Sequence, residues 1–114
     1  MNRPLFPAAF CLAAATALAV GVAAAADLTP LGKWMKPNMG AALAGQDFDT
    51  LQKNFEFVSG KAPSADYAQW ATFAKAGAAG AGKKDIAAVK GACKQCHDNY
   101  KEKYRKEFAA RPFP

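Results

Sequence analysis

The chain has 114 residues, with 15 Lys and Arg against 9 Asp and Glu and a formal net charge of +6. That length accommodates one small domain, in which a hydrophobic core alone gives marginal stability. Three Cys and a single His exclude a structural zinc site within one chain, because such a site takes four ligands and Cys11 lies in an N-terminal segment that we expect to be removed.

This N-terminal segment, residues 1–26, has the features of a secretory signal peptide. Arg3 supplies a positive charge, an Ala-rich apolar run follows, and small residues lead up to Asp27 as at a cleavage site. We therefore expect cleavage after residue 26, loss of Cys11 with the signal, and export to the periplasm. An uncleaved membrane anchor is the alternative, because the apolar run is long enough to span a bilayer. After cleavage we expect no stable membrane insertion.

Residues 27–114 are expected to form a single all-α domain. No segment alternates at the strand period, and Gly and Pro separate four helical patterns. The patterns predict helices at about 31–44, 47–58, 64–76 and 83–108, with a turn at 77–82. Pro37 means that the first helix either begins near Lys36 or carries a kink. Asp47 or Asp49 is the expected N-cap of the second helix. Four helices joined by short loops predict an antiparallel four-helix bundle.

The fourth helical pattern contains Cys93, Cys96 and His97 in the spacing C-x-x-C-H. This spacing is the attachment signature of c-type haem. Residues three and four apart share one face of a helix, so all three side chains can meet one flat macrocycle. A thioredoxin-like pair is expected near a βαβ pattern, which is missing here, and a simple disulfide leaves His97 without a role. We predict one covalently attached haem c, bound mainly by the C-terminal helix, with two thioethers and His97 on the iron.

The positive charge is concentrated in the part of the chain that carries this motif. Residues 83–114 hold nine Lys and Arg against four Asp and Glu. A basic region can indicate nucleic-acid binding, but export argues against that partner. A solvated helix face accounts for many of these side chains. The functional interpretation is a positive surface around a haem edge that steers acidic redox partner proteins.

The stretch from Gly91 to Lys101 resembles the last helix of class II c-type cytochromes, the cytochrome c′ and cytochrome c556 group. In that family the haem motif lies near the C-terminus of a four-helix bundle, as it does here. In low-spin members a methionine of the first helix is the second axial ligand. The Met35-Lys36 step resembles that position, so the resemblance implies Met35 as the ligand, with Met39 as the alternative. A dimer through the first two helices is also left open.

These observations lead to a functional hypothesis. We expect a periplasmic monohaem c-type cytochrome, not an enzyme, that carries single electrons between redox partners through a low-spin His/Met haem. The presence of only one C-x-x-C-H motif excludes a multi-haem array. The alternative is a five-coordinate, cytochrome c′-like protein that binds nitric oxide or carbon monoxide. The third hypothesis is a protein without haem, in which the motif forms a disulfide or binds a metal.

Overall fold

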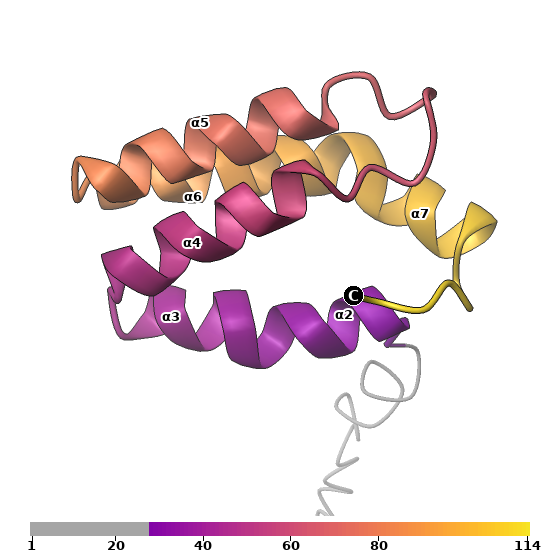
Figure 1. The fold of residues 1–114 in the computed structure, drawn as a ribbon, viewed down its shortest axis with the longest axis horizontal. Coiled ribbons are helices and arrows are strands. Elements are labelled where there is room, and N and C mark those ends of the chain that lie inside the picture. The colour runs from indigo at the N-terminus through magenta and orange to yellow at the C-terminus, as the bar shows by residue number, and fades with distance from the viewer. Residues whose placement is uncertain (1–27) are drawn as a thin grey trace, which may run out of the picture.

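Residues 28–114 are described by a computed structural model and fold into an all-α domain with four helices. The predicted signal peptide, residues 1–26, lies outside the described residues. Two of the four helices contain a π-helical turn, so the first consists of α2, η1 and α3 and the last of α6, η2 and α7 (Figure 1). The bounds are α2 (Pro30–Met35), η1 (Lys36–Gly40), α3 (Ala41–Ala44), α4 (Phe48–Ser59), α5 (Trp70–Gly82), α6 (Ile86–Cys96), η2 (His97–Lys101) and α7 (Glu102–Glu107).

Side-chain caps define where three of the helices begin. The Thr29 hydroxyl accepts a hydrogen bond from the Gly32 amide at 3.1 Å and starts the first helix. Asp47 accepts from the Thr50 amide at 3.2 Å and starts α4, which confirms one of the two caps predicted from the sequence. Asp85 does the same for α6. These carboxylates satisfy amide groups that have no partner inside the helix.

Pro37 widens the first helix instead of ending it. Proline removes one helical hydrogen bond, and the chain responds with the π turn η1, in which the Ala41 amide donates to the Lys36 carbonyl. The Asn38 side chain donates to the Trp34 carbonyl at 2.8 Å. The Asn54 side chain on α4 donates to the Asn38 carbonyl at 2.7 Å. The helix therefore runs on past the proline, and its π turn is tied to α4.

The third helix differs from its predicted bounds at both ends. We expected a helix over 64–76 and a turn over 77–82, whereas α5 spans Trp70–Gly82. The small residues pack closely against neighbouring helices and do not form a turn. A Cβ atom on Gly77 would lie 2.5 Å from Cε1 of Phe55 in α4, and one on Gly80 would lie 2.9 Å from Cβ of Ala88 in α6. The glycines thus let α5 approach both neighbours.

Replacing Gly77 by alanine is expected to destabilise the protein by roughly 1–3 kcal/mol, because the new methyl group clashes with the Phe55 ring. Gly91→Ala is the matched control, since no atom lies within 4 Å of a Cβ atom built there. Removing a glycine from a helix interior should raise stability by about 0.5–1 kcal/mol. Chemical denaturation of both variants checks the pair, and equal stability would contradict the packing argument.

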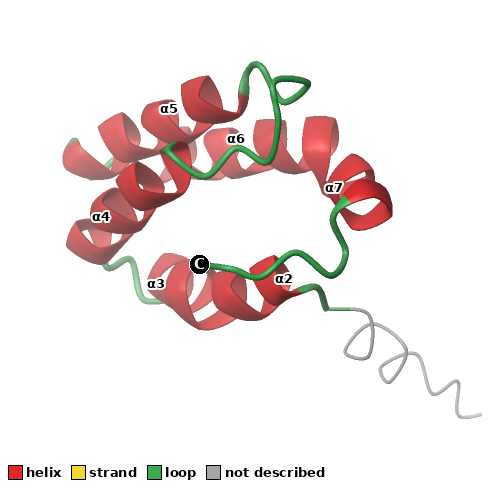
Figure 2. Ribbon diagram, turned by 45° about the vertical axis from the view of Figure 1, so that its right-hand side comes forward, coloured by secondary structure: helices red, strands yellow, loops and turns green. Residues whose placement is uncertain are grey.

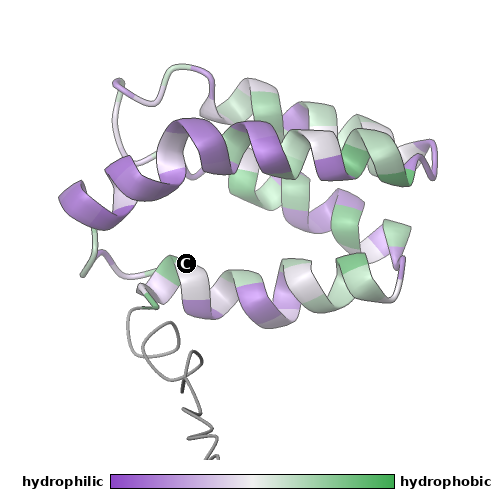
Figure 3. Ribbon diagram, turned by 180° about the vertical axis from the view of Figure 1, so that it is seen from behind, coloured by the Kyte–Doolittle hydropathy of each residue, from purple (hydrophilic) through white to green (hydrophobic). Residues whose placement is uncertain are grey.

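The core lies where α5 packs against α4 on one side and α6 on the other, while η1 and α3 pack against α4. The last helix begins at Ile86 and not at the predicted 83, and its Val89, Tyr100 and Tyr104 are buried in the core. Seen from behind, this helix presents many hydrophilic residues outward (Figure 3). The buried hydrophobic cluster comprises Leu31, Met39, Ala42, Leu51, Phe55, Val58, Tyr67, Trp70, Phe73, Ala74, Ala78, Ala81, Val89, Tyr100 and Tyr104.

Candidate functional site

The C-x-x-C-H residues all lie in the last helix, at the junction of α6 and η2. Cys93 and Cys96 are half-buried and pack against the hydrophobic core, whereas His97 is exposed. The His97 amide donates to the carbonyls of Cys93 and Lys94, so the helical spacing continues through the motif. The two sulfur atoms and the imidazole therefore belong to adjacent turns of one helix, as the sequence spacing predicts.

Both cysteines are free thiols, which is the form needed for addition to another group. Burial raises the pKa of the Cys93 thiol. Burial, with a smaller contribution from Cys93, raises the pKa of the Cys96 thiol to about 11. At neutral pH both groups are therefore protonated, and a protonated thiol is less reactive toward oxidants and alkylating agents than a thiolate.

The imidazole of His97 is neutral at physiological pH. Partial burial by nearby residues lowers the pKa of His97, and the positive charge of Lys101 lowers it further. The negative charge of Asp98 opposes this shift. A neutral ring keeps one nitrogen lone pair available, and that lone pair is what a metal-ligating histidine provides. The surroundings of His97 thus favour the neutral form of its ring.

A π turn, η2, begins at His97 and was not anticipated from the sequence. The Asn99 side chain donates to the Gln95 carbonyl at 2.7 Å. Asn38 makes the same four-residue contact in η1, where its partner is Trp34. Each π turn therefore has an asparagine at its third position, and the only signal in the sequence is that shared residue type. Such turns often occur at functional sites, and these two start directly at His97 and directly after Met35.

Beyond the motif, Tyr100 and Tyr104 of the last helix form an aromatic cluster with Tyr67 and Trp70. Tyr100 contacts Tyr67 with ring centroids 5.0 Å apart, and its hydroxyl accepts from the Gln69 amide at 2.8 Å. Trp70 donates its indole N–H to the Val58 carbonyl at 2.8 Å and is a core residue. The Tyr104 hydroxyl is buried without a hydrogen-bond partner. This cluster holds the last helix against the residues just before α5 and against Trp70, the first residue of α5.

The two methionines proposed as axial ligands lie in the first helix but in different settings. Met35 ends α2 and is half-buried, whereas Met39 lies in η1 and is buried in the core. The first helix packs against α4 and the last against α5. The backbones of these two helices stand apart in both ribbon views (Figures 1 and 2). The two cysteines and His97 therefore lie on the last helix and Met35 and Met39 on the first, and these two helices pack against different neighbours.

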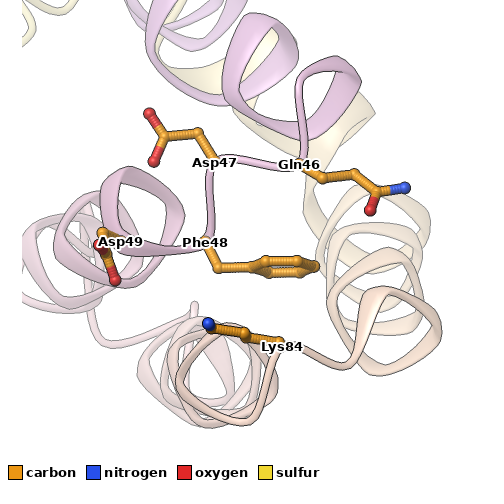
Figure 4. A pocket seen from close by; sticks show the side chains of 5 residues that line it. All are labelled: Gln46, Asp47, Phe48, Asp49 and Lys84. Atoms are coloured by element: carbon orange, nitrogen blue, oxygen red, sulfur yellow. The ribbon is translucent and has the colours of Figure 1, made fainter.

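Two surface hollows lie away from the motif. One is lined by Gln46, Asp47, Phe48, Asp49 and Lys84 (Figure 4). The other is lined by Asp49, Gln52, Lys53 and Glu56. Neither includes a cysteine, a histidine or a methionine, so neither coincides with the predicted site.

The predicted basic surface retains an excess of cations after local pairing. Three of its acids form exposed ion pairs along the last helix: Asp98 with Lys94, Glu107 with Lys103 at 2.9 Å, and Glu102 with Arg105 at 3.2 Å. Since residues 83–114 hold nine basic and four acidic side chains, positive charge exceeds negative charge along this helix. Exposed pairs of this kind add little to stability.

Comparison with known proteins identifies no relative: no family model, no curated protein and no solved structure matches this chain. In the described part, residues 28–114, no helix combines the length and apolar character needed to cross a membrane. Over the same residues, no three or more His, Cys, Asp or Glu side chains are gathered closely enough to hold a bare metal ion.

Proposed function

We propose that this protein is a periplasmic monohaem c-type cytochrome that carries single electrons between redox partners. The observation that carries the proposal is the donor set on the last helix: two free, half-buried thiols and a neutral imidazole at the C-x-x-C-H spacing. This set fits a haem because it supplies two groups for covalent attachment and one nitrogen ligand for iron. The proposed activity is electron transfer and not catalysis on a substrate.

Each residue of the motif has a defined part in this proposal. Cys93 and Cys96 would hold a haem through two thioethers: each thiol would add across a vinyl double bond, with the sulfur on one carbon and the proton on the other, so no oxidant is required. His97 would ligate the iron through the lone pair of a ring nitrogen. When bound, the haem supplies one-electron chemistry by cycling between ferric and ferrous iron. The half-buried position of the thiols keeps the attached edge against the hydrophobic core.

The proposed family is that of the class II c-type cytochromes, and the proposed architecture is their antiparallel four-helix bundle with the haem held mainly by the last helix. Support comes from the four helices of the domain and from the position of the motif in the last of them. The first helix carries both methionines, as a sixth ligand in this family requires. Met35 is the proposed ligand because it is half-buried, and Met39 is the alternative.

A five-coordinate protein that binds nitric oxide or carbon monoxide is the second candidate function. The observation that favours it is that the backbones of the first helix, which carries Met35 and Met39, and of the last helix stand apart (Figure 2) and pack against different neighbours. In this alternative the methionines are core residues, as flexible thioethers often are.

The proposed partners are redox proteins with an acidic docking face, because cations exceed acids on the last helix. Nucleic acid is not a proposed partner, and stable membrane insertion is not proposed once the signal peptide is removed. A dimer remains an alternative to a monomer.

The visible spectrum of the exported protein tests the proposal, recorded oxidised and reduced, with and without carbon monoxide. Sharp low-spin bands, a weak sulfur-to-iron charge-transfer band and indifference to carbon monoxide support the electron carrier. Broad high-spin bands that shift with carbon monoxide support the gas-binding alternative. Absence of haem bands after expression with a cytochrome maturation system overturns both.

A further inference from the structure

Three aromatic rings from distant parts of the chain meet at the surface. Trp34 of α2, Phe57 of α4 and Phe113 near the C-terminus have ring centroids 5.5 Å (Trp34–Phe57), 5.2 Å (Trp34–Phe113) and 6.0 Å (Phe57–Phe113) apart. The Lys61 ammonium lies 4.9 Å from the centroid of the Phe57 ring. Edge and tilted ring contacts of this kind are favourable beyond the area that they bury. The C-terminal residues are therefore attached to the first two helices.

The segment 108–114, which we call the C-terminal strap, contacts the rest of the domain through Phe113 and Arg111. Within the strap, the Arg111 amide donates to the Phe108 carbonyl at 3.0 Å. The Arg111 guanidinium donates to the Lys61 carbonyl at 3.2 Å. The strap thus leaves the end of α7 and reaches α2, and both views place the C-terminus beside the first helix (Figures 1 and 2).

The strap matters because the two halves of the first helix are held differently. Its later half, η1 and α3, packs directly against α4. The earlier half, α2, meets α4 and the strap through the Trp34 ring. Met35 is the next residue, so the contact that holds Trp34 also fixes the position of the proposed sixth ligand.

We propose that the C-terminal strap is a positioning element that, through Phe113 and Arg111, holds α2 and the proposed ligand Met35 in place relative to the last helix. This inference rests on the proposed haem function, and it applies whether the sixth position is filled by sulfur or open. With Met35 on the iron, the strap keeps the sulfur in place. With an open position, it limits entry of a diatomic gas. In both cases a loosened strap exposes the iron to external ligands.

The test compares carbon monoxide binding by the haem-loaded wild-type protein with that of Phe113→Ala and Phe113→Trp. Phe113→Ala removes the ring contacts. With an open sixth position in the wild type, the variant should bind carbon monoxide roughly two- to tenfold faster, as expected from the strength of such contacts. With Met35 on the iron and a wild type that does not respond to carbon monoxide, the variant should begin to bind it. Phe113→Trp keeps an aromatic ring and should restore a rate near that of the wild type. Hydrogen exchange of the amides of residues 32–41 supplies a second readout, which should increase only in the alanine variant.

Gly77→Ala is the matched control, because it weakens the contact between α5 and Phe55 without altering the strap. An equal rise in carbon monoxide binding in this variant would mean that general destabilisation explains the result for Phe113→Ala, and it would overturn the inference. Unchanged binding and exchange in Phe113→Ala would overturn it as well, with the haem function intact. A wild-type protein without haem would instead overturn the proposed function, and the positioning role with it.

Discussion

Replacing either Cys93 or Cys96 by alanine is expected to leave the haem held by one thioether, and replacing both is expected to abolish covalent attachment. The physical reason is that non-covalent contacts alone hold the haem once both sulfur–carbon bonds are lost. The measurement is the haem stain of the denatured protein together with the pyridine haemochrome spectrum, in which one and two thioether bonds give different band positions. The double variant should carry no haem through denaturation.

Lys94→Ala and Gln95→Ala are the controls for this experiment, because both positions lie between the cysteines and are exposed. They should retain full haem content. His97→Ala should retain the thioethers but lose its axial nitrogen, which changes the spin state. Normal haem content in the double cysteine variant would contradict the assignment of the motif.

Replacing Met35 by alanine should convert a low-spin, carbon-monoxide-insensitive haem into a high-spin haem that binds carbon monoxide. A thioether ligand closes the sixth position and raises the reduction potential, so the potential of the variant should fall. The sulfur-to-iron charge-transfer band should vanish completely. Spectra and redox titration measure these changes.

Met39→Ala tests which of the two methionines is the iron ligand. Because Met39 is buried, this substitution should lower the free energy of unfolding by about 2–5 kcal/mol while leaving the spectrum unchanged. The reverse pattern, with the band lost only in Met39→Ala, would transfer the ligand role to Met39. An unchanged spectrum in both single variants would exclude a methionine ligand and support the gas-binding alternative.

The parts of the fold that follow from local chemistry could be predicted from the sequence. The four helices and the Asp47 cap each depend on side chains within one or two turns. The segment from Gly77 to Gly82 was predicted wrongly as a turn. Glycine is common both in turns and at close helix contacts, and only the neighbouring Phe55 and Ala88 decide between them.

The parts that depend on distant contacts could not be predicted. The motif identifies Cys93, Cys96 and His97 from spacing alone, but the setting of each methionine depends on how the first helix packs. The contact of Phe113 with Trp34 joins the two ends of the domain and leaves no local pattern. The bundle, the haem and the sixth ligand stay predictions that the experiments above address.

The π turn at His97 divides the last helix into two α-helical segments, α6 and α7, that are out of phase with each other. The segment before the turn, α6, packs against α5, while Tyr104 in the segment after it packs its ring against Tyr67, which precedes α5. Converting residues 97–101 to regular α-helix without deleting a residue would rotate one segment against the other by roughly 100°. The packing contacts of α6 and of α7 could then not form at the same time. The motif should therefore be transferred to another protein together with the whole segment 86–107. The five residues C-x-x-C-H alone do not fix the rotation of α6 relative to α7.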